Sequence, residues 1–565
     1  MNNYFKKRAD VVIIGGGGAA CRAAIESAYN NTDVIMILKN KLGKSGATDY
    51  QAAESAAYNI ADRQNEEELE RFYSDIVQAG MGMANPKLAR ILVEESEDSL
   101  KFLEQKGVIF EKDDKNYLKF KACFSSLPRS HVVKGHGVPI VRALKKEIEK
   151  LKIKVFENCM VANLFVKNEE ILGLGMLDEN MNYVVIEAKS VVLAMGGAGQ
   201  LFFTNLNPPE ITGDGYSLGY QVGAKLINLE FMQAGLGIVY PINSLLNQWI
   251  WSGYPKLFNK ENREFLRNYL PENIDEKLCM KDKSLHYPFT SRDNSRYIDV
   301  AIHSEINNGR GTEHNGIYLD LSDLSINSSD DPVYRQMLPF TLEWLSEKGL
   351  YPFHQSIEIA NFGHAINGGL LIDEHAETSI HGLFAAGEVA GGPHGADRLG
   401  GNMLVTCQVF GARAGKFSAL YSKKRKAYPK IEEDYITNMK YHIFILLKKD
   451  INESFLRQEL QKTLNKCLLV KRSSKSLETS LDEIKKIKKY INQADSSEKM
   501  NSCNLELMNL LIVGELMATA AILRRESRGS HFRLDFQERD DKNWDFLQLI
   551  QKKDDRPYFS YEKYY

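Results

Sequence analysis

The chain has 565 residues, of which 43% are hydrophobic and 26% charged, and its formal net charge is −2. This length exceeds the size at which one hydrophobic core stops growing, so we expect two to four domains. The balanced charge gives no bulk attraction to nucleic acid, and we expect no such partner. The cysteines are widely spaced and form no C-x-x-C pair, so we expect no disulfide framework, bound metal or internal iron–sulfur cluster.

The N-terminal residues 1–10 are polar. They lack the apolar segment and the small-residue cleavage site of a signal peptide. No apolar run approaches the roughly 20 residues needed to span a bilayer. We therefore expect a cytoplasmic protein without direct membrane insertion.

A strand, a turn, a helix and a second strand follow in order. Val11–Ile14 is a β-branched run that stops at Gly15–Gly18, Ala19–Ala28 has helical spacing, and Val34–Leu38 has the composition of a buried strand. This order is typical of a βαβ unit in a parallel sheet.

Similar buried-strand patterns recur at Ser190–Met195 and Leu383–Ala386. If these distant strands share one sheet, their domain is discontinuous. The sequence between them becomes aromatic and irregular, and after them it becomes helical and rich in Lys, Glu and Leu. The expected division is therefore an α/β domain in two parts (1–240 and 355–415), an inserted capping domain (241–354), and a helical C-terminal domain with a tail (416–565).

The glycine turn after the first strand has the spacing G-x-G-x-x-A. Gly15 makes the tight turn, Gly17 lets the backbone approach a pyrophosphate, and Ala20 permits close helix–strand packing. Gly18 opens the helix, whose free N–H groups favour anions. The alternative is a purely structural turn, but in this context the pattern predicts dinucleotide binding.

The second strand ends without the acidic residue that usually holds a ribose. That position is Leu38 or Lys39, and we keep Lys39 as a candidate cofactor contact. A carboxylate follows later at Asp214, which could hold a ribose or cap a helix.

Further small residues could lie along a bound cofactor. In Lys44–Thr48 the alternative is a surface turn, and Gly197 follows a buried strand. The candidates are Ser45, Gly46, Ala47, Thr48 and Gly197.

The segment Gly387–Asn402 holds more glycine than a strand–helix connection needs, which indicates close backbone approach to a ligand. Glu388 can accept from ligand hydroxyls, and Arg398 can bind a carboxylate bidentately. The alternative for Arg398 is a structural ion pair with Asp397 or Glu388. Asn402, Met403 and Leu404 complete the cofactor candidates.

Together these motifs resemble the flavoprotein subunits of fumarate reductase and succinate dehydrogenase, a family that includes L-aspartate oxidase and adenylylsulfate reductase. Gly387–Asn402 is similar to the family's flavin and substrate signature. Arg524–His531 and Glu538–Trp544 are similar to its C-terminal signature. The resemblance implies FAD and an α/β fold, in which a Rossmann-like FAD-binding domain carries an inserted α+β capping domain and a helical C-terminal domain.

The resemblance also implies catalytic residues. Arg292, in Thr290–Asp293, matches the arginine that exchanges a proton with the substrate. His364 matches the histidine of the H-x-x-x-G-G segment, and Arg398 matches the carboxylate-binding arginine. Each residue alone could be packed or surface-paired, but the set favours function.

The chain departs from the family at two places. Gly46 stands where respiratory members carry the histidine linked to FAD, so the resemblance implies non-covalent FAD. Ala234–Gly237 replaces a segment whose His and Thr bind the second substrate carboxylate. Because each such contact is worth roughly 1.5–3 kcal/mol, we do not expect plain fumarate or succinate as substrate. His131 and His136 could substitute, or could be ordinary surface histidines.

Hydride transfer between flavin N5 and a small carboxylate-bearing substrate is the expected reaction. The alternatives are amine oxidation of the L-aspartate oxidase kind, a flavoprotein like that of adenylylsulfate reductase, and a flavin-binding module without chemistry. The amino-acid-recognising glutamate of L-aspartate oxidase has no counterpart near Ser126–Gly137, and the retained Arg292, His364 and Arg398 argue against the module. An iron–sulfur or other electron-transfer protein is a possible partner.

Overall fold

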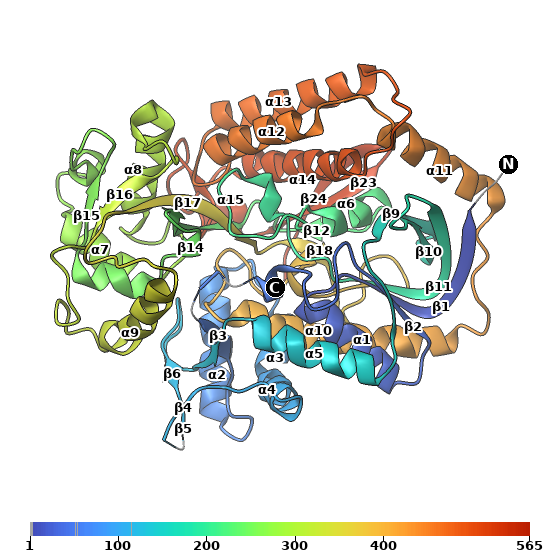
Figure 1. Cartoon of the computed structure of the whole chain (residues 1–565), viewed down its shortest axis with the longest axis horizontal. Coiled ribbons are helices and arrows are strands. Elements are labelled where there is room, and N and C mark those ends of the chain that lie inside the picture. The colour runs from blue at the N-terminus through green and yellow to red at the C-terminus, as the bar shows by residue number, and fades with distance from the viewer. Residues whose placement is uncertain (1–3, 51, 54, 115, 565) are drawn as a thin grey trace.

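The largest sheet of the molecule unites strands that lie far apart in the sequence. The structure is a computed structural model that describes residues 4–50, 52–53, 55–114 and 116–564 (Figure 1). The strand order is β8 (Lys154–Phe156), β2 (Val34–Ile37), β1 (Phe5–Ile14), β11 (Tyr183–Leu193), β10 (Glu170–Leu177) and β9 (Met160–Lys167), with β19 (Leu383–Ala385) paired to β11. β1 and β19 both run parallel to β11, so the expectation that these distant strands share one sheet is confirmed.

Helices cover this sheet because its central strands are buried on both faces. α1 (Gly18–Tyr29) follows the glycine turn and packs against α5 (Val138–Lys150) and α10 (Asn402–Lys424). Gly415 makes the close contact with α1 possible, because a Cβ there would lie 2.3 Å from the Ala23 carbonyl oxygen. This packing fixes the N-terminus of α10 beside the glycine turn.

A second hydrophobic core lies beside the first (Figure 1, left). Its sheet has the order β14 (Ser244–Leu245), β13 (Met232–Tyr240), β17 (Ile357–Ile366), β16 (Ile317–Asp320) and β15 (Lys256–Phe258). α7 (Glu276–Lys283), α8 (Arg296–Glu305) and α9 (Pro332–Glu347) accompany it. Phe120, Ala122 and Val132 also join this core, although they precede the segment 241–354.

The C-terminal part contains the long helices α11 (Glu433–Leu447), α12 (Glu453–Cys467), α13 (Ser474–Gln493) and α14 (Cys503–Leu523), and the short helix α15 (Asp541–Trp544). The expectation that no apolar run reaches membrane-spanning length is wrong, because α14 is long and apolar enough by composition. However, 67% of its most apolar stretch is buried inside the molecule, where α14 packs against α6 (Asp214–Gln221), α12 and α13. α14 therefore has the burial and the packing of a core helix.

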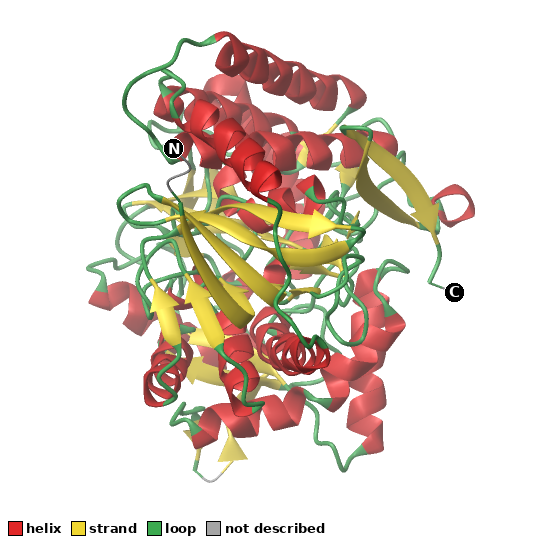
Figure 2. Cartoon of the chain, turned by 90° about the vertical axis from the view of Figure 1, so that its right-hand side faces the viewer, coloured by secondary structure: helices red, strands yellow, loops and turns green. Residues whose placement is uncertain are grey.

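A third sheet joins the C-terminal hairpin to the middle of the chain. Its order is β20 (Ala390–Gly391), β18 (Gly369–Leu371), β12 (Leu226–Ile227), β23 (Leu547–Lys553) and β24 (Arg556–Glu562). The hairpin stands at the edge of the molecule in Figure 2. The sheet carries β18 and β20, so the segments that follow His364 and precede Arg398 are held side by side.

Candidate active site

A cavity lies between the parallel sheet and the second core and is lined by residues of both. The glycine turn, the segment after β2 and the start of α10 line its long side. Trp249 of the second core also lines it, as do Tyr287, His364 and Arg398.

The glycine turn presents bare backbone to this cavity. Gly15 has φ +125°, and a Cβ there would lie 2.2 Å from the Ala194 carbonyl oxygen. No side chain caps α1 at Gly17, and a Cβ there would meet nothing closer than 3.7 Å. Ala20 is fully buried on α1, behind the turn. The start of α1 is therefore open for an anion to approach its N–H groups.

The segment after β2 packs on this turn. Gly46 has φ +84°, and a Cβ there would lie 2.9 Å from the Gly17 Cα. The Thr48 hydroxyl accepts a hydrogen bond of 3.2 Å from the Gly18 N–H. Ser45, Gly46, Ala47 and Thr48 all line the cavity, so the surface-turn alternative is wrong.

Lys39 and Asp214 meet in the lining of the cavity. The Lys39 ammonium lies 2.6 Å from an Asp214 oxygen and 2.6 Å from a Glu506 oxygen. Burial opposes its charge, but the two carboxylates together raise the pKa of Lys39. The helix cap is Gly213, so the alternative that Asp214 caps α6 is wrong. A cation therefore occupies the usual acidic position, and Asp214 supplies a carboxylate beside it.

Glu388 also lines the cavity. One of its oxygens accepts a hydrogen bond of 3.0 Å from the Ile366 N–H, and burial raises the pKa of the carboxyl to about 7. Gly197 makes room for it, because a Cβ there would lie 2.2 Å from the same oxygen. Met403 and Leu404 line the cavity, whereas Gly197 and Asn402 are not among its lining residues.

Arg398 and His364 form a buried pair. Arg398 Nη1 donates to the Leu399 carbonyl at 3.0 Å, and Nη2 donates to His364 Nε2 at 3.3 Å. Among the described residues, no ion pair joins Arg398 to a carboxylate and its Nε lacks a partner, so the structural ion-pair alternative is wrong. Burial and the charge of Arg398 lower the pKa of His364 to about 3, which keeps the imidazole neutral. A buried guanidinium with no described carboxylate within ion-pair distance favours an incoming anion.

Arg292 lies outside this cavity. Its side chain is exposed, with the guanidinium 5.2 Å from the Phe124 ring centroid. The loop that carries it is nevertheless tied to the Arg398 loop, because the Thr290 hydroxyl donates to Asp397 at 2.7 Å. Burial raises the pKa of Asp397 to about 6. The structure thus brings two of the three expected catalytic residues together and leaves the third nearby.

His131 and His136 are not surface residues, so that alternative is wrong. His131 is buried and its Nδ1 contacts the Arg129 carbonyl at 2.9 Å. His136 lines the cavity, and its buried Nδ1 lacks a hydrogen-bond partner in the described structure. Burial lowers the pKa of both to about 4, so both are neutral near pH 7.

Cys123 and Tyr287 line the cavity without belonging to a recognised motif. The Tyr287 N–H donates to the Cys123 sulfur at 2.9 Å. The sequence indicated these two residues only indirectly. The small residues in Ala234–Gly237 leave space that a larger side chain from elsewhere in the chain must fill.

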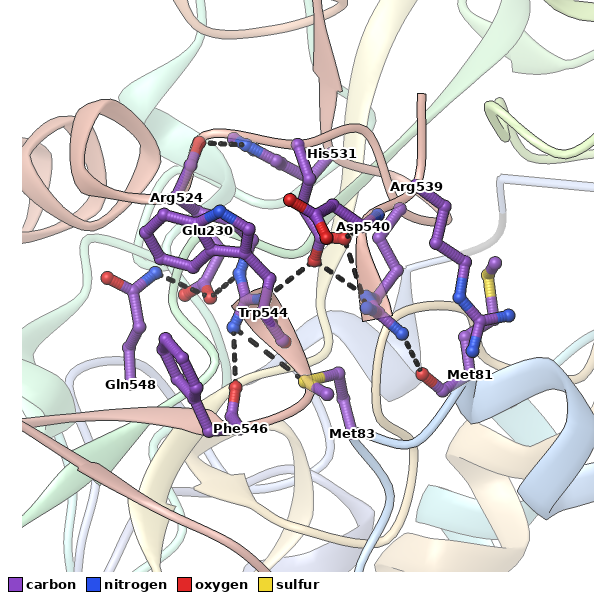
Figure 3. A network of polar contacts seen from close by, with 12 residues as sticks. Met81, Met83, Glu230, Arg524, His531, Arg539, Asp540, Trp544, Phe546 and Gln548 are labelled. Carbon is purple, nitrogen blue, oxygen red and sulfur yellow. Dashed lines mark hydrogen bonds and ion pairs between the residues drawn. The ribbon is translucent and has the colours of Figure 1, made fainter. Parts of the chain in front are cut away.

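The C-terminal signature forms a buried ionic network (Figure 3). Arg524 contacts Glu230 at 2.7 Å and Glu526 at 2.8 Å, and Arg528 contacts Glu526 at 2.7 Å. Arg528 also donates to the Met81 carbonyl at 2.6 Å. Each of these four charged side chains is fully buried.

The same signature holds the loops that carry Arg292 and Arg398. The Ser291 N–H donates to the Gly529 carbonyl at 2.8 Å, and the Ser530 hydroxyl donates to the Ala396 carbonyl at 2.9 Å. The loops of Arg292 and Arg398 are therefore anchored to neighbouring residues of one segment.

Comparison with known protein families gives two matching family models. The family model described as "FAD binding domain" matches residues 10–250 and 294–404, and "Fumarate reductase flavoprotein C-term" matches residues 457–564. The chain belongs to the fumarate reductase flavoprotein family. It is therefore an FAD-dependent oxidoreductase, and the two-part match agrees with its discontinuous sheet.

Individual relatives carry out different reactions, as their names state. One subunit of the fumarate reductase (CoM/CoB) of Methanothermobacter marburgensis is 33% identical over 94% of each chain. An L-aspartate oxidase of Bacillus subtilis is 27% identical over 97% of this chain and 94% of its own. Among solved structures, Sdh1 of Mycobacterium smegmatis has a TM-score of 0.84 and 27% identity, covering 99% of this chain and 95% of that one.

The cavity fits the FAD that the family binds. The bare start of α1 suits a pyrophosphate, Asp214 and Glu388 are carboxylates able to accept from hydroxyls, and the glycines leave room for close backbone approach.

Proposed function

We propose that this protein transfers hydride to or from a C–C bond next to a carboxylate. The observation that carries the proposal is the buried Arg398, which contacts His364 but no carboxylate of the described chain. A guanidinium in this position is suited to bidentate binding of a substrate carboxylate.

Each residue of the set has a separate task in this proposal. Arg398 and the neutral His364 bind and orient the carboxylate. Arg292 exchanges the proton at the neighbouring carbon, while FAD bound in the cavity supplies or accepts the hydride. Because Arg292 lies outside the cavity wall, we propose that the segment 241–354 moves as a cap and closes over the substrate.

The part of the cavity beside Ala234–Gly237 suits a substrate other than plain fumarate or succinate. The Ala234–Gly237 segment offers no charged side chain. The nearby wall includes Phe120, Leu245 and Trp249, which are apolar. The substrate that we propose is therefore a small acid whose second end carries no free charge.

FAD is proposed to bind without a covalent link. Gly46 has no side chain, and its backbone packs directly on Gly17. Acid or heat should release yellow FAD from the purified protein. Flavin that stays with the denatured chain would contradict the proposal.

An electron-transfer partner is proposed because the Methanothermobacter marburgensis relative is one subunit of its enzyme. A partner with an iron–sulfur centre would exchange electrons with the flavin, and copurification of the native protein tests for it. The expected cytoplasmic location stays a prediction.

The deciding experiment is anaerobic. The FAD-loaded protein is reduced and mixed with unsaturated acids, and the oxidised protein is mixed with saturated acids and L-aspartate, while flavin absorbance is followed. Reoxidation by an unsaturated acid supports the proposal. Reduction by L-aspartate alone would favour amine oxidation, the kind of reaction named for the Bacillus subtilis relative.

A further inference from the structure

The Tyr287 hydroxyl lies in the proposed substrate region and forms no hydrogen bond with the described residues. Its ring packs edge-to-face on His364, with 5.3 Å between ring centroids, and lies 6.2 Å from the Phe362 ring. The hydroxyl oxygen is buried and has no hydrogen-bond partner among the described residues. Because buried polar groups are nearly always hydrogen-bonded, such a hydroxyl calls for a partner from outside the chain.

Gly235 explains how Tyr287 reaches this place. An ideal Cβ on Gly235 would lie 2.3 Å from the Tyr287 hydroxyl oxygen. Gly235 pairs with Phe362 across β13 and β17, two residues before His364. Tyr287 therefore occupies the space that a side chain at residue 235 would use, and it does so beside the pair formed by His364 and Arg398.

The surroundings define what this hydroxyl can bind. Cys123 and Phe362 form an apolar cluster with Tyr287, and Leu206 and Leu245 pack against it. Burial raises the pKa of Tyr287 well above its ordinary value, so the group is a neutral donor near pH 7. A neutral donor in an apolar wall favours an uncharged acceptor such as a carbonyl, ester or amide oxygen.

We propose that the Tyr287 hydroxyl donates a hydrogen bond to an oxygen at the end of the substrate opposite the carboxylate held by Arg398. This inference rests on the proposed function and narrows its substrate class to small unsaturated acids with a second, uncharged oxygen. Tyr287 is then a specificity-determining residue.

Binding of two related acids to the oxidised, FAD-loaded enzyme tests this proposal. Monomethyl fumarate has an ester where crotonate has a methyl group, and flavin absorbance reports the Kd of each. The wild-type protein should bind monomethyl fumarate about three- to tenfold more tightly than crotonate. Tyr287→Phe should abolish this margin and leave the crotonate Kd within about twofold.

A second variant and a control separate the effect of losing the hydroxyl from a general effect on folding. Gly235→Ala displaces the hydroxyl by a different route and should also remove the margin. Tyr183→Phe removes a buried hydroxyl that is hydrogen-bonded to Asn163, away from the cavity, and should keep it.

Two results would overturn the inference. The wild-type protein could bind monomethyl fumarate no more tightly than crotonate, or the tighter binding of monomethyl fumarate could survive in Tyr287→Phe and Gly235→Ala. The titration requires no turnover. Failure of hydride transfer in the anaerobic screen would therefore refute the proposed reaction separately from this inference.

Discussion

Two regions of the molecule bury arginine side chains in opposite ways. In the C-terminal network, Arg524 and Arg528 share Glu526 and reach further carboxylates and carbonyls (Figure 3). In the cavity, Arg398 contacts a backbone carbonyl and a neutral histidine, and its Nε has no partner in the described structure. The arginines of the two regions are alike in burial and differ in whether a carboxylate of the described chain pairs with them.

The difference follows from the energetics of buried charge. A guanidinium removed from water is stabilised only by a nearby anion and by hydrogen bonds. The network supplies both from within the chain, so we expect its loss to destabilise the fold. In the proposed function a ligand supplies the anion in the cavity, so we expect the loss of Arg398 to weaken binding. Four predictions test this contrast.

The largest effect is expected at Arg292, the exposed arginine that the proposed cap would bring to the substrate. Arg292→Ala should lower kcat by about 10²–10⁴-fold, because it removes a proton donor, while FAD content stays the same. Arg292→Lys is the matched variant: partial recovery indicates electrostatics, and no recovery indicates a placed proton shuttle. Near-wild-type turnover in Arg292→Ala would refute the assignment.

Arg524→Ala should destabilise the protein by about 3–5 kcal/mol, because it leaves buried Glu230 and Glu526 without a shared partner. The free energy of unfolding in urea measures this effect. Its exposed neighbour Arg525 provides the control, since Arg525→Ala should change stability by about 0.5 kcal/mol or less. Equal losses of stability in the two variants would contradict the structural role of Arg524.

Arg398→Ala should raise KM by about 10- to 150-fold through loss of a charged hydrogen bond, with little change in kcat. Its free energy of unfolding should not fall as that of Arg524→Ala does, because no buried carboxylate loses a partner. Steady-state kinetics and urea unfolding measure the two quantities. A stability loss like that of Arg524→Ala, with KM unchanged, would show that Arg398 is structural.

The smallest effect concerns pH. Burial raises the pKa of Glu388 to about 7 and that of Asp397 to about 6, so both become anionic as the pH rises across this range. The added negative charge near Arg398 should raise KM for an anionic substrate about three- to tenfold between pH 6 and 8. His364 has a pKa of about 3 and stays neutral throughout. Glu388→Gln should flatten the profile, and an unchanged profile in that variant would contradict this account.

Local patterns predicted the cofactor half of the molecule. Val11–Ile14, the glycine turn and the helix after it are contiguous, so their periodicity and spacing suffice to predict a βαβ unit. The position of Lys39 beside Asp214 and Glu506 could not be predicted, because it joins three elements that are remote in sequence.

The substrate half was predicted less completely. The pairing of Arg398 with His364 agrees with the resemblance, and the partner-free Nε of Arg398 agrees with a binding role. Tyr287 belongs to no motif, and its importance depends on the absence of a side chain across the strand at Gly235. The helix α14 was misjudged because the apolar stretch Cys503–Leu523 contains two acidic residues, Glu506 and Glu515, that obscure its length.

The hydrogen bonds from the C-terminal signature also order events during synthesis. Ser530 lies 134 residues after Ala396, and Gly529 lies still further from Ser291, so the loops that carry Arg292 and Arg398 leave the ribosome long before the residues that anchor them. The glycine turn, α1 and β11 are translated well before that point. A growing chain can therefore form most of the flavin cradle while the loops of Arg292 and Arg398 are unanchored, and these two hydrogen bonds can form only after Gly529 and Ser530 have been synthesised.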